Sequence, residues 1–91
     1  MLDVRILDEA QDYLRTLPDK HARQILKKIE LLARNPLAPK TKLLAGYEPL
    51  RRFRAGNYRI VYFVDGSVLK VPLIDKRNDD TIYRRLKQMF R

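Results

Sequence analysis

Residues 50–62 read LRRFRAGNYRIVY, and this stretch decides the fold. Two runs rich in aromatic and β-branched residues flank Gly56-Asn57, a pair that is typical of a tight turn between antiparallel strands. The stretch therefore predicts a β-hairpin with strands over about 50–55 and 58–64. It also carries four arginines, although like charges on neighbouring strands repel each other.

The predicted turn determines which arginines share a face of the hairpin. A two-residue turn places Arg54 opposite Arg59, and residues two apart on one strand project from the same face. Arg52 therefore joins them, whereas Arg51 points with Phe53 towards the other face or its rim. No carboxylate within the stretch neutralises the three arginines. A fixed cluster of guanidinium groups is well suited to binding phosphate.

The Asp-Gly pair at 65–66 predicts a second tight turn, which leads into a third strand over 67–74. Pairing through this turn would place Lys70 beside the arginines and Ile74 on the arginine face at the strand's end. Pro72 donates no hydrogen bond to a neighbouring strand, so it predicts an edge or a bulge. Two apolar pairs are expected on the opposite face: Leu69 with Tyr62, and Val71 with Ile60.

The segment before the hairpin predicts a short strand around 4–6 and two helices. Asp8 begins a capping-box pattern for the first helix, which the Leu-Pro pair at 17–18 ends. The second helix would run from about Asp19 to Asn35. Apolar residues at helical spacing form one face of each helix: Ala10, Tyr13, Leu14 and Leu17, then Ala22, Ile25, Ile29, Leu32 and Ala33.

The remaining segments complete an α+β fold. Residues 37–48 are expected to form a loop with a basic element at Lys40 and Lys42, and residues 75–80 a polar loop. A docked C-terminal helix or a frayed tail is predicted by Ile82, Leu86, Met89 and Phe90. We expect one domain over 1–91, in which the N-terminal strand and an antiparallel helix hairpin pack on one face of a small, mainly antiparallel sheet. The arginine face is expected to be open.

The charge balance predicts an anionic partner. Twenty Lys and Arg against eleven Asp and Glu give a net charge of +9. Nucleic acid is favoured over a membrane surface because the basic residues are spread along the chain rather than gathered on one amphipathic helix. The chain has no cysteine and no long apolar run, which predicts a cytoplasmic protein without disulfides or a membrane span. His21 is expected to be an ordinary surface residue, and we expect no metal and no cofactor.

The order of these segments resembles that of the RelE/ParE superfamily of toxins from bacterial and archaeal toxin–antitoxin pairs. The resemblance covers essentially the whole chain. It rests on the helix hairpin ending in Leu-Pro, Lys42-Leu43 with Gly46, LRRFRAGNYRIVYFV, and KRNDDTIY. RelE-type members cleave mRNA in the ribosomal A site, and ParE-type members poison DNA gyrase. The implied partners are mRNA on the ribosome (30S A site, 16S rRNA) and a cognate antitoxin in a hetero-oligomeric complex.

The RelE-type catalytic set, carried over onto this chain, implies five site residues. Arg52 and Arg54 match the paired basic positions, Arg59 matches the arginine of the YRxxY strand, and Arg77 with Tyr83 matches the later pair spaced by six. The implied reaction is metal-free attack of the RNA 2′-hydroxyl on the adjacent phosphate. The hairpin arginines would hold the phosphate, Tyr83 would act as base, and Arg77 would protect the leaving oxygen. The RNA-binding candidates are Lys40, Lys42, Lys70 and Lys76.

Two other functions stay open at this point. The best-known RelE pattern has lysines where this chain has Arg52 and Arg54, and arginine is a poorer proton donor. A ParE-type gyrase inhibitor without nuclease activity is therefore the first alternative, although Arg77 and Tyr83 argue against it. The second is a non-toxic basic module that binds RNA or a partner protein. The antitoxin would be acidic and cover the basic face, or would displace the C-terminal helix and so move Tyr83.

Overall fold

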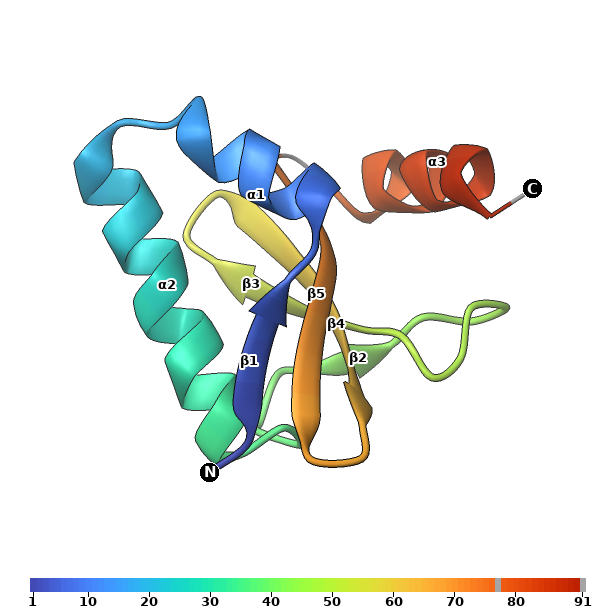
Figure 1. The fold of residues 1–91 in the computed structure, drawn as a ribbon. Helices are drawn as coiled ribbons and strands as arrows, with labels where there is room; N and C mark the ends of the chain where they lie inside the picture. Colours follow the sequence, from blue (N-terminus) through green and yellow to red (C-terminus); the bar gives the residue numbers. More distant parts are fainter. Residues whose placement is uncertain (77, 91) are drawn as a thin grey trace.

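A mixed five-stranded sheet with helices on both sides forms the structure, a computed structural model that describes residues 1–76 and 78–90 (Figure 1). The elements are β1 (Asp3–Ile6), α1 (Asp8–Arg15), α2 (Asp19–Arg34), β2 (Lys42–Leu43), β3 (Arg51–Ala55), β4 (Tyr58–Asp65), β5 (Val68–Lys76) and α3 (Asp79–Met89). The strand order is β1-β5-β4-β3-β2, with β1 parallel to β5 and the other neighbours antiparallel. The expected α+β class is confirmed.

Helices α1 and α2 form the expected hairpin and cover one face of the sheet (Figure 1). The capping box expected at Asp8 is wrong, because Leu7 is the N-cap residue and no side chain caps α1. The Leu7 N–H donates to the Val71 carbonyl at 2.9 Å, so the chain leaves the sheet only at this residue. Asp8 therefore falls in the first turn, where its negative charge interacts favourably with the helix dipole.

The β3–β4 hairpin has the predicted register. Gly56 adopts a φ of +61°, a left-handed conformation that glycine takes without a steric cost. Arg54 pairs with Arg59, and Phe53 pairs with Ile60. Phe53 and Ile60 are buried in the core beneath α1 and α2. The arginines accordingly project from the opposite face of the sheet.

The β4–β5 hairpin departs from the predicted register. Its turn falls at 66–67, one residue later than expected, so Leu69 pairs with Val64 instead of Tyr62. Phe63 in turn pairs with Lys70. The shift leaves each of these residues on its expected face. It moves Lys70 two positions along β4, about 7 Å farther from the arginines than predicted.

A β-bulge next to Pro72 changes the faces of the residues that follow it. Beyond the bulge Val61 pairs with Leu73, and Ile60 pairs with Ile74 instead of Val71. The additional residue in β5 turns Leu73 to the arginine face and Ile74 into the core beneath α1 and α2. The expectation that Ile74 lies on the arginine face is therefore wrong.

Helix α3 covers part of the face that was expected to be open. Ile82 and Leu86 are fully buried there against Val61 and Leu73. The bulge is one cause, since it adds Leu73 to an apolar strip that must be shielded from water. The expected polar loop at 75–80 is also mostly regular structure, because β5 extends to Lys76 and α3 begins at Asp79. The other buried members of this core are Leu44 and Leu50.

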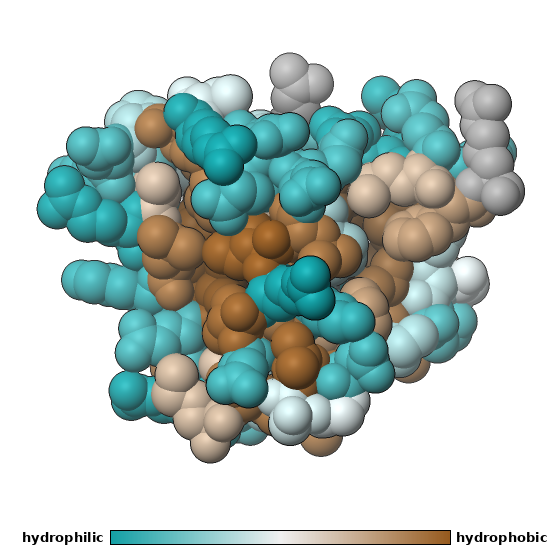
Figure 2. Space-filling view, viewed as in Figure 1, coloured by the Kyte–Doolittle hydropathy of each residue, from teal (hydrophilic) through white to brown (hydrophobic). Residues whose placement is uncertain are grey.

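The surface on the side of β1 is apolar at its centre, with hydrophilic side chains around it (Figure 2). β1 is one edge of the sheet, and β2 is the other. Neither α1, α2 nor α3, as far as the described ranges go, is long and apolar enough to cross a membrane.

Arg51 lies on the helix side of β3, as predicted. It pairs with Tyr62 of β4, and its Nη2 donates to Thr41 Oγ1 at 3.4 Å. The Tyr62 hydroxyl donates to the carbonyl of Pro36. Burial raises the pKa of Tyr62, and the Thr41 hydrogen bond and the Arg51 charge offset this only in part.

The raised pKa of Tyr62 predicts a loss of stability at alkaline pH. A tyrosine with a raised folded pKa stabilises the fold below its unfolded pKa of about 10, and that contribution is lost as pH rises through the folded pKa. Thermal unfolding between about pH 9 and pH 11 should therefore show a falling Tm that falls less steeply in Tyr62→Phe. Tyr47→Phe is the control at a less buried tyrosine. Equal slopes in all three proteins would contradict this role of Tyr62.

Candidate functional site

Three arginines meet the start of α3 at one hollow, which we call the arginine site. Arg52 and Arg54 come from β3, and Arg59 comes from β4. The hollow has a volume of about 300 Å³ and is also lined by Asn78, Asp79 and Asp80. The structure thus brings together the three hairpin arginines that the sequence placed on one face.

Asp79 pairs with two of these arginines. Arg52 Nη2 donates to Asp79 Oδ2 at 3.0 Å, and Arg52 Nε lies 3.0 Å from Oδ1. Arg59 Nε lies 3.7 Å from the same Oδ1 atom. The side chains of Arg52 and Arg59 are only 12% and 14% exposed, whereas that of Asp79 is 34% exposed. The two guanidinium groups are therefore largely enclosed, and the carboxylate lies nearer to solvent.

The carboxylates of Asp79 and Asp80 do not balance the positive charge of the three arginines at this site. Folding lowers the pKa of Arg59, chiefly because of burial and then because of the charge of Arg54, with a smaller contribution from Arg52. Asp79 opposes this shift and does not cancel it. The Nε atoms of Arg52 and Arg59 make no well-directed hydrogen bond to any described residue, despite the short Arg52 contact. Both Nε atoms are buried, so the site holds an excess of positive charge and two unsatisfied donors.

The expectation that nothing local neutralises the arginines is incomplete, because Asp79 does so in part. Asp79 lies 27 residues from Arg52 in the sequence, so a search for carboxylates within the stretch could not find it. The sequence did contain a candidate partner for the arginines, because the acidic pair Asp79-Asp80 follows the third strand at the start of the predicted last helix.

Contacts along α3 hold its first turn at the arginine site. The Asn78 side chain caps the helix by accepting from the Thr81 N–H at 3.1 Å. Arg85 pairs with Asp75 of β5 at 3.1 Å and with Glu9 of α1 at 2.9 Å. Ion pairs to two elements, together with the buried apolar face of α3, therefore fix the position of the helix.

Tyr83 lies on the first half of α3, as the sequence predicted, but its hydroxyl contacts the loop before β3. The hydroxyl oxygen accepts from the Ala45 N–H at 3.0 Å, and the ring packs at a tilt against Tyr47 with centroids 6.0 Å apart. No hydrogen bond joins Tyr83 to a hairpin arginine in the described part of the chain. Among the described residues, this hydroxyl donates to no acceptor. Arg77, its predicted partner, lies outside the described residues.

Comparisons with known proteins identify the family. A family model described as "ParE toxin of type II toxin-antitoxin system, parDE" matches residues 4–81. The chain belongs to the RelE/ParE superfamily of toxins. A search of curated proteins gave no significant match.

Solved structures of RelE toxins share the fold. The archaeal RelE of a RelE–RelB complex from Pyrococcus horikoshii OT3 is 28% identical, with a TM-score of 0.72 over 85% of this chain and 96% of that chain. A chain of the RelBE2 toxin–antitoxin complex from Mycobacterium tuberculosis is 26% identical, with a TM-score of 0.72 over 84% and 98%. The isolated E. coli RelE toxin is 20% identical, with a TM-score of 0.73 over the full length of both chains.

The four lysines predicted to bind RNA lie at different places on the toxin. Lys76 lines a small hollow with Arg54 and Arg59, so it extends the arginine site towards the β3–β4 turn. Lys42 of β2 pairs with Arg52 and shares its face of the sheet. Lys40 precedes β2 in a left-handed backbone conformation, with a φ of +73°.

Lys70 lies apart from the arginine site, because the changed register moved it towards the β4–β5 turn. Its Nζ pairs with Asp65 at 2.8 Å and lies 5.9 Å from the centre of the Phe63 ring. This pairing lowers the pKa of Asp65. The structure therefore places Lys42 on the arginine face beside Arg52, Lys76 beside Arg54 and Arg59 at the β3–β4 end of the sheet, and Lys70 at the far end of the arginine face.

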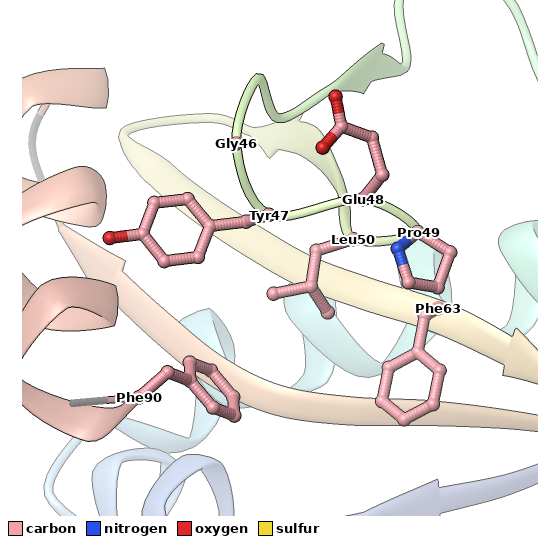
Figure 3. A pocket seen from close by; sticks show the side chains of 7 residues that line it. All are labelled: Gly46, Tyr47, Glu48, Pro49, Leu50, Phe63 and Phe90. Carbon is pink, nitrogen blue, oxygen red and sulfur yellow. The ribbon is translucent and has the colours of Figure 1, made fainter.

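A second hollow, of about 350 Å³, is apolar and lies between the loop before β3 and the end of α3. Leu50, Phe63 and Phe90 surround it, Tyr47 reaches towards α3, and the Glu48 carboxylate points away (Figure 3). Such a lining suits an apolar side chain better than a phosphate. This hollow is therefore not a second anion site.

His21 lies in the first turn of α2. It is exposed, and its Nδ1 is hydrogen-bonded to the hydroxyl of Tyr58 at 2.8 Å. Its ring also packs edge-on against Tyr58, with centroids 5.8 Å apart. Across residues 1–76 and 78–90, no group of three or more His, Cys, Asp or Glu side chains could hold a metal ion.

Proposed function

We propose that this toxin is a ribosome-dependent endoribonuclease that cleaves mRNA in the A site and so stops translation. The observation that carries the proposal is that Arg52, Arg54 and Arg59 line one hollow that has an excess of positive charge. The side chains of Arg52 and Arg59 are largely enclosed there. Guanidinium groups fixed on a sheet bind phosphate oxygens with little loss of side-chain entropy. The likeness to RelE chains at 26% and 28% identity supports the same activity.

In the proposed reaction the RNA supplies its own nucleophile. The 2′-oxygen forms a bond to the adjacent phosphorus, and the bond from phosphorus to the 5′-oxygen breaks. The products are a 2′,3′-cyclic phosphate and a 5′-hydroxyl, so one proton leaves the 2′-oxygen and one reaches the 5′-oxygen. Arg52, Arg54 and Arg59 stabilise the negative charge that develops on the phosphate oxygens.

Tyr83 and Arg77 serve the two proton transfers in this proposal. As the phenolate, Tyr83 takes the 2′-hydroxyl proton and becomes neutral, and before that step the Ala45 N–H stabilises the negative charge on its oxygen. Arg77 stabilises the leaving 5′-oxygen by a hydrogen bond, and a water molecule supplies the proton that this oxygen takes up. Because arginine and tyrosine are weak acid–base groups at neutral pH, orientation of the mRNA by the ribosome must supply much of the rate. Lys42 and Lys76 extend the phosphate-binding surface on either side.

The second proposed partner is a cognate antitoxin, which would bind the toxin and keep it inactive. Relatives of this toxin have been crystallised as RelE–RelB complexes from Pyrococcus horikoshii and Methanococcus jannaschii. We propose a hetero-oligomeric complex in the cytoplasm, in which an acidic antitoxin covers the arginine site or displaces α3. Displacement of α3 would remove Tyr83 from the site, and coverage would block the arginines. Either arrangement would leave the toxin inactive.

A ParE-type inhibitor of DNA gyrase is the second candidate. Two observations favour it: the matching family model is described as a ParE toxin, and the Tyr83 hydroxyl contacts Ala45 rather than the arginines. In that case the basic face would bind gyrase, and no RNA bond would break.

Purified toxin added to ribosomes programmed with an mRNA distinguishes the two candidates. The nuclease proposal expects cleavage of A-site mRNA to a 2′,3′-cyclic phosphate, and no inhibition of gyrase supercoiling. The control is the same mRNA without ribosomes, which should be cleaved far more slowly. Intact mRNA together with inhibited supercoiling would establish the gyrase candidate instead. If neither activity appears and expression without antitoxin leaves growth normal, both readings fail.

A further inference from the structure

We propose that Asp79 is a resident anion of the arginine site, which the RNA phosphate must replace before the toxin can act. The inference deepens the proposed function and rests on the role of the hairpin arginines as the phosphate site. It assigns to Asp79 the regulation of that site: the carboxylate occupies the arginines when RNA is absent and leaves them when RNA binds.

The contacts of Arg52 show that carboxylate and phosphate compete for the same donors. Arg52 Nη2 donates to Asp79 Oδ2 at 3.0 Å, and Nε of the same guanidinium edge lies 3.0 Å from Oδ1 without a well-directed hydrogen bond. This two-donor edge is the one that binds carboxylate or phosphate in a bidentate manner. A phosphate cannot use it while Asp79 is there. RNA binding therefore requires the exchange of one anion for another.

The fit of Asp79 is poor enough for a phosphate to displace it. Arg59 Nε lies 3.7 Å from Asp79 Oδ1, beyond hydrogen-bonding distance, and it has no other acceptor among the described residues. Arg54 makes no described ion pair, and it lines the same hollow. A phosphate group offers more acceptor oxygens than one carboxylate, so once it has replaced Asp79 it can pair with donors that Asp79 leaves unused.

The position of Asp79 in α3 allows it to leave without unfolding the helix. Asp79 is the first residue of α3 and is one-third exposed, whereas the buried anchors Ile82 and Leu86 lie one and two turns further along. Arg85 is also tied down beyond the first turn, by Asp75 and Glu9. A change in the Asp79 side chain or in the first turn thus opens the arginine site while α3 stays docked.

The decisive variant is Asp79→Asn, which keeps the shape of the side chain and removes its charge. Binding is measured by fluorescence anisotropy with a short single-stranded RNA in which every 2′-hydroxyl is methylated, so that cleavage cannot occur. We expect Asp79→Asn to bind this RNA about tenfold more tightly than the wild type, because the competing charge-assisted pair is gone. Thermal unfolding of the free protein checks that the variant is folded.

Asp80→Asn is the matched variant for the effect of charge alone. It removes the same charge from the same helical turn, and Asp80 makes no ion pair with a described residue. We expect it to tighten binding by about twofold at most, the effect of one nearby solvated charge. An equal gain in both variants, or no gain in Asp79→Asn, would overturn the proposed exchange.

A second measurement uses the wild-type protein and needs no variant to fold. The ¹³C resonance of the Asp79 side-chain carboxyl should move when the methylated RNA is added, and more than that of Asp80. An unchanged Asp79 resonance at saturating RNA would overturn the inference. Neither binding measurement involves ribosomes or cleavage. A toxin that cleaves mRNA without this exchange would refute the inference alone, and a toxin that exchanges Asp79 for RNA without cleaving would refute the nuclease proposal alone.

Discussion

Replacing Arg59 with glutamine is expected to lower ribosome-dependent mRNA cleavage by about 100- to 1,000-fold, the usual effect of removing one donor that stabilises charge in a transition state. Arg59 is only 14% exposed and lies between Arg54, Arg52 and Asp79. Its position on β4, opposite Arg54, is set by the hairpin register. Single-turnover cleavage on programmed ribosomes measures the loss.

The same variant should not lose stability, which separates a catalytic effect from misfolding. Folding lowers the pKa of Arg59, so the fold disfavours its charged form, and a neutral glutamine removes that penalty. We therefore expect a Tm equal to or above that of the wild type. Arg51→Gln, on the opposite face of β3, removes the same charge and should cleave normally. Equal loss of cleavage in both variants would contradict the placement of Arg59 at the phosphate.

Tyr83→Phe is expected to have the second large effect, a loss of about 100-fold or more in cleavage, because it removes the proposed general base. The variant also loses the hydrogen bond with the Ala45 N–H, so a decrease in stability of about 1 kcal/mol should accompany the kinetic loss. RNA binding should change little, because the hairpin arginines remain. Cleavage and anisotropy together measure the two effects separately.

Tyr47→Phe provides the control for Tyr83→Phe. Tyr47 packs against Tyr83 in the same aromatic pair, and its own hydroxyl has no hydrogen bond to a described residue. The variant removes a hydroxyl from the ring next to Tyr83 and leaves the Tyr83 hydroxyl in place, so it should cleave mRNA at the wild-type rate. Full activity of Tyr83→Phe would require another base and would move support towards the gyrase candidate.

The local part of the arginine site could be predicted from the sequence. Gly56-Asn57 permits one tight turn, and a two-residue turn determines the face of every residue in both strands. The pairing of Arg54 with Arg59 and the separation of Arg51 follow from that turn alone. Such information is contained in about a dozen neighbouring residues, and no distant contact can change it without breaking the hairpin.

The rest of the site depends on contacts between distant segments. Successive side chains of a strand alternate between its two faces, and this rule gave the correct faces for β5 residues up to the bulge. The bulge at Pro72 adds one residue to β5, so the same rule gave the wrong face for Ile74. α3 then docks on the strip that contains Leu73, and this docking brings Asp79 to Arg52. Sequence spacing does not reveal which helix covers which strip. The partner of the arginines could therefore be found only from the packed structure.

The direction of β4 also provides a route to site-specific labelling. Arg59 lies near the start of this strand, and the Gly66-Ser67 turn follows its end, about 20 Å away at the rise of an extended strand. Ser67 is exposed, and the chain contains no cysteine. Ser67→Cys would therefore introduce one reactive thiol at the opposite end of β4 from the arginines. A fluorophore there could report the approach of labelled mRNA by energy transfer without touching the groups that bind it.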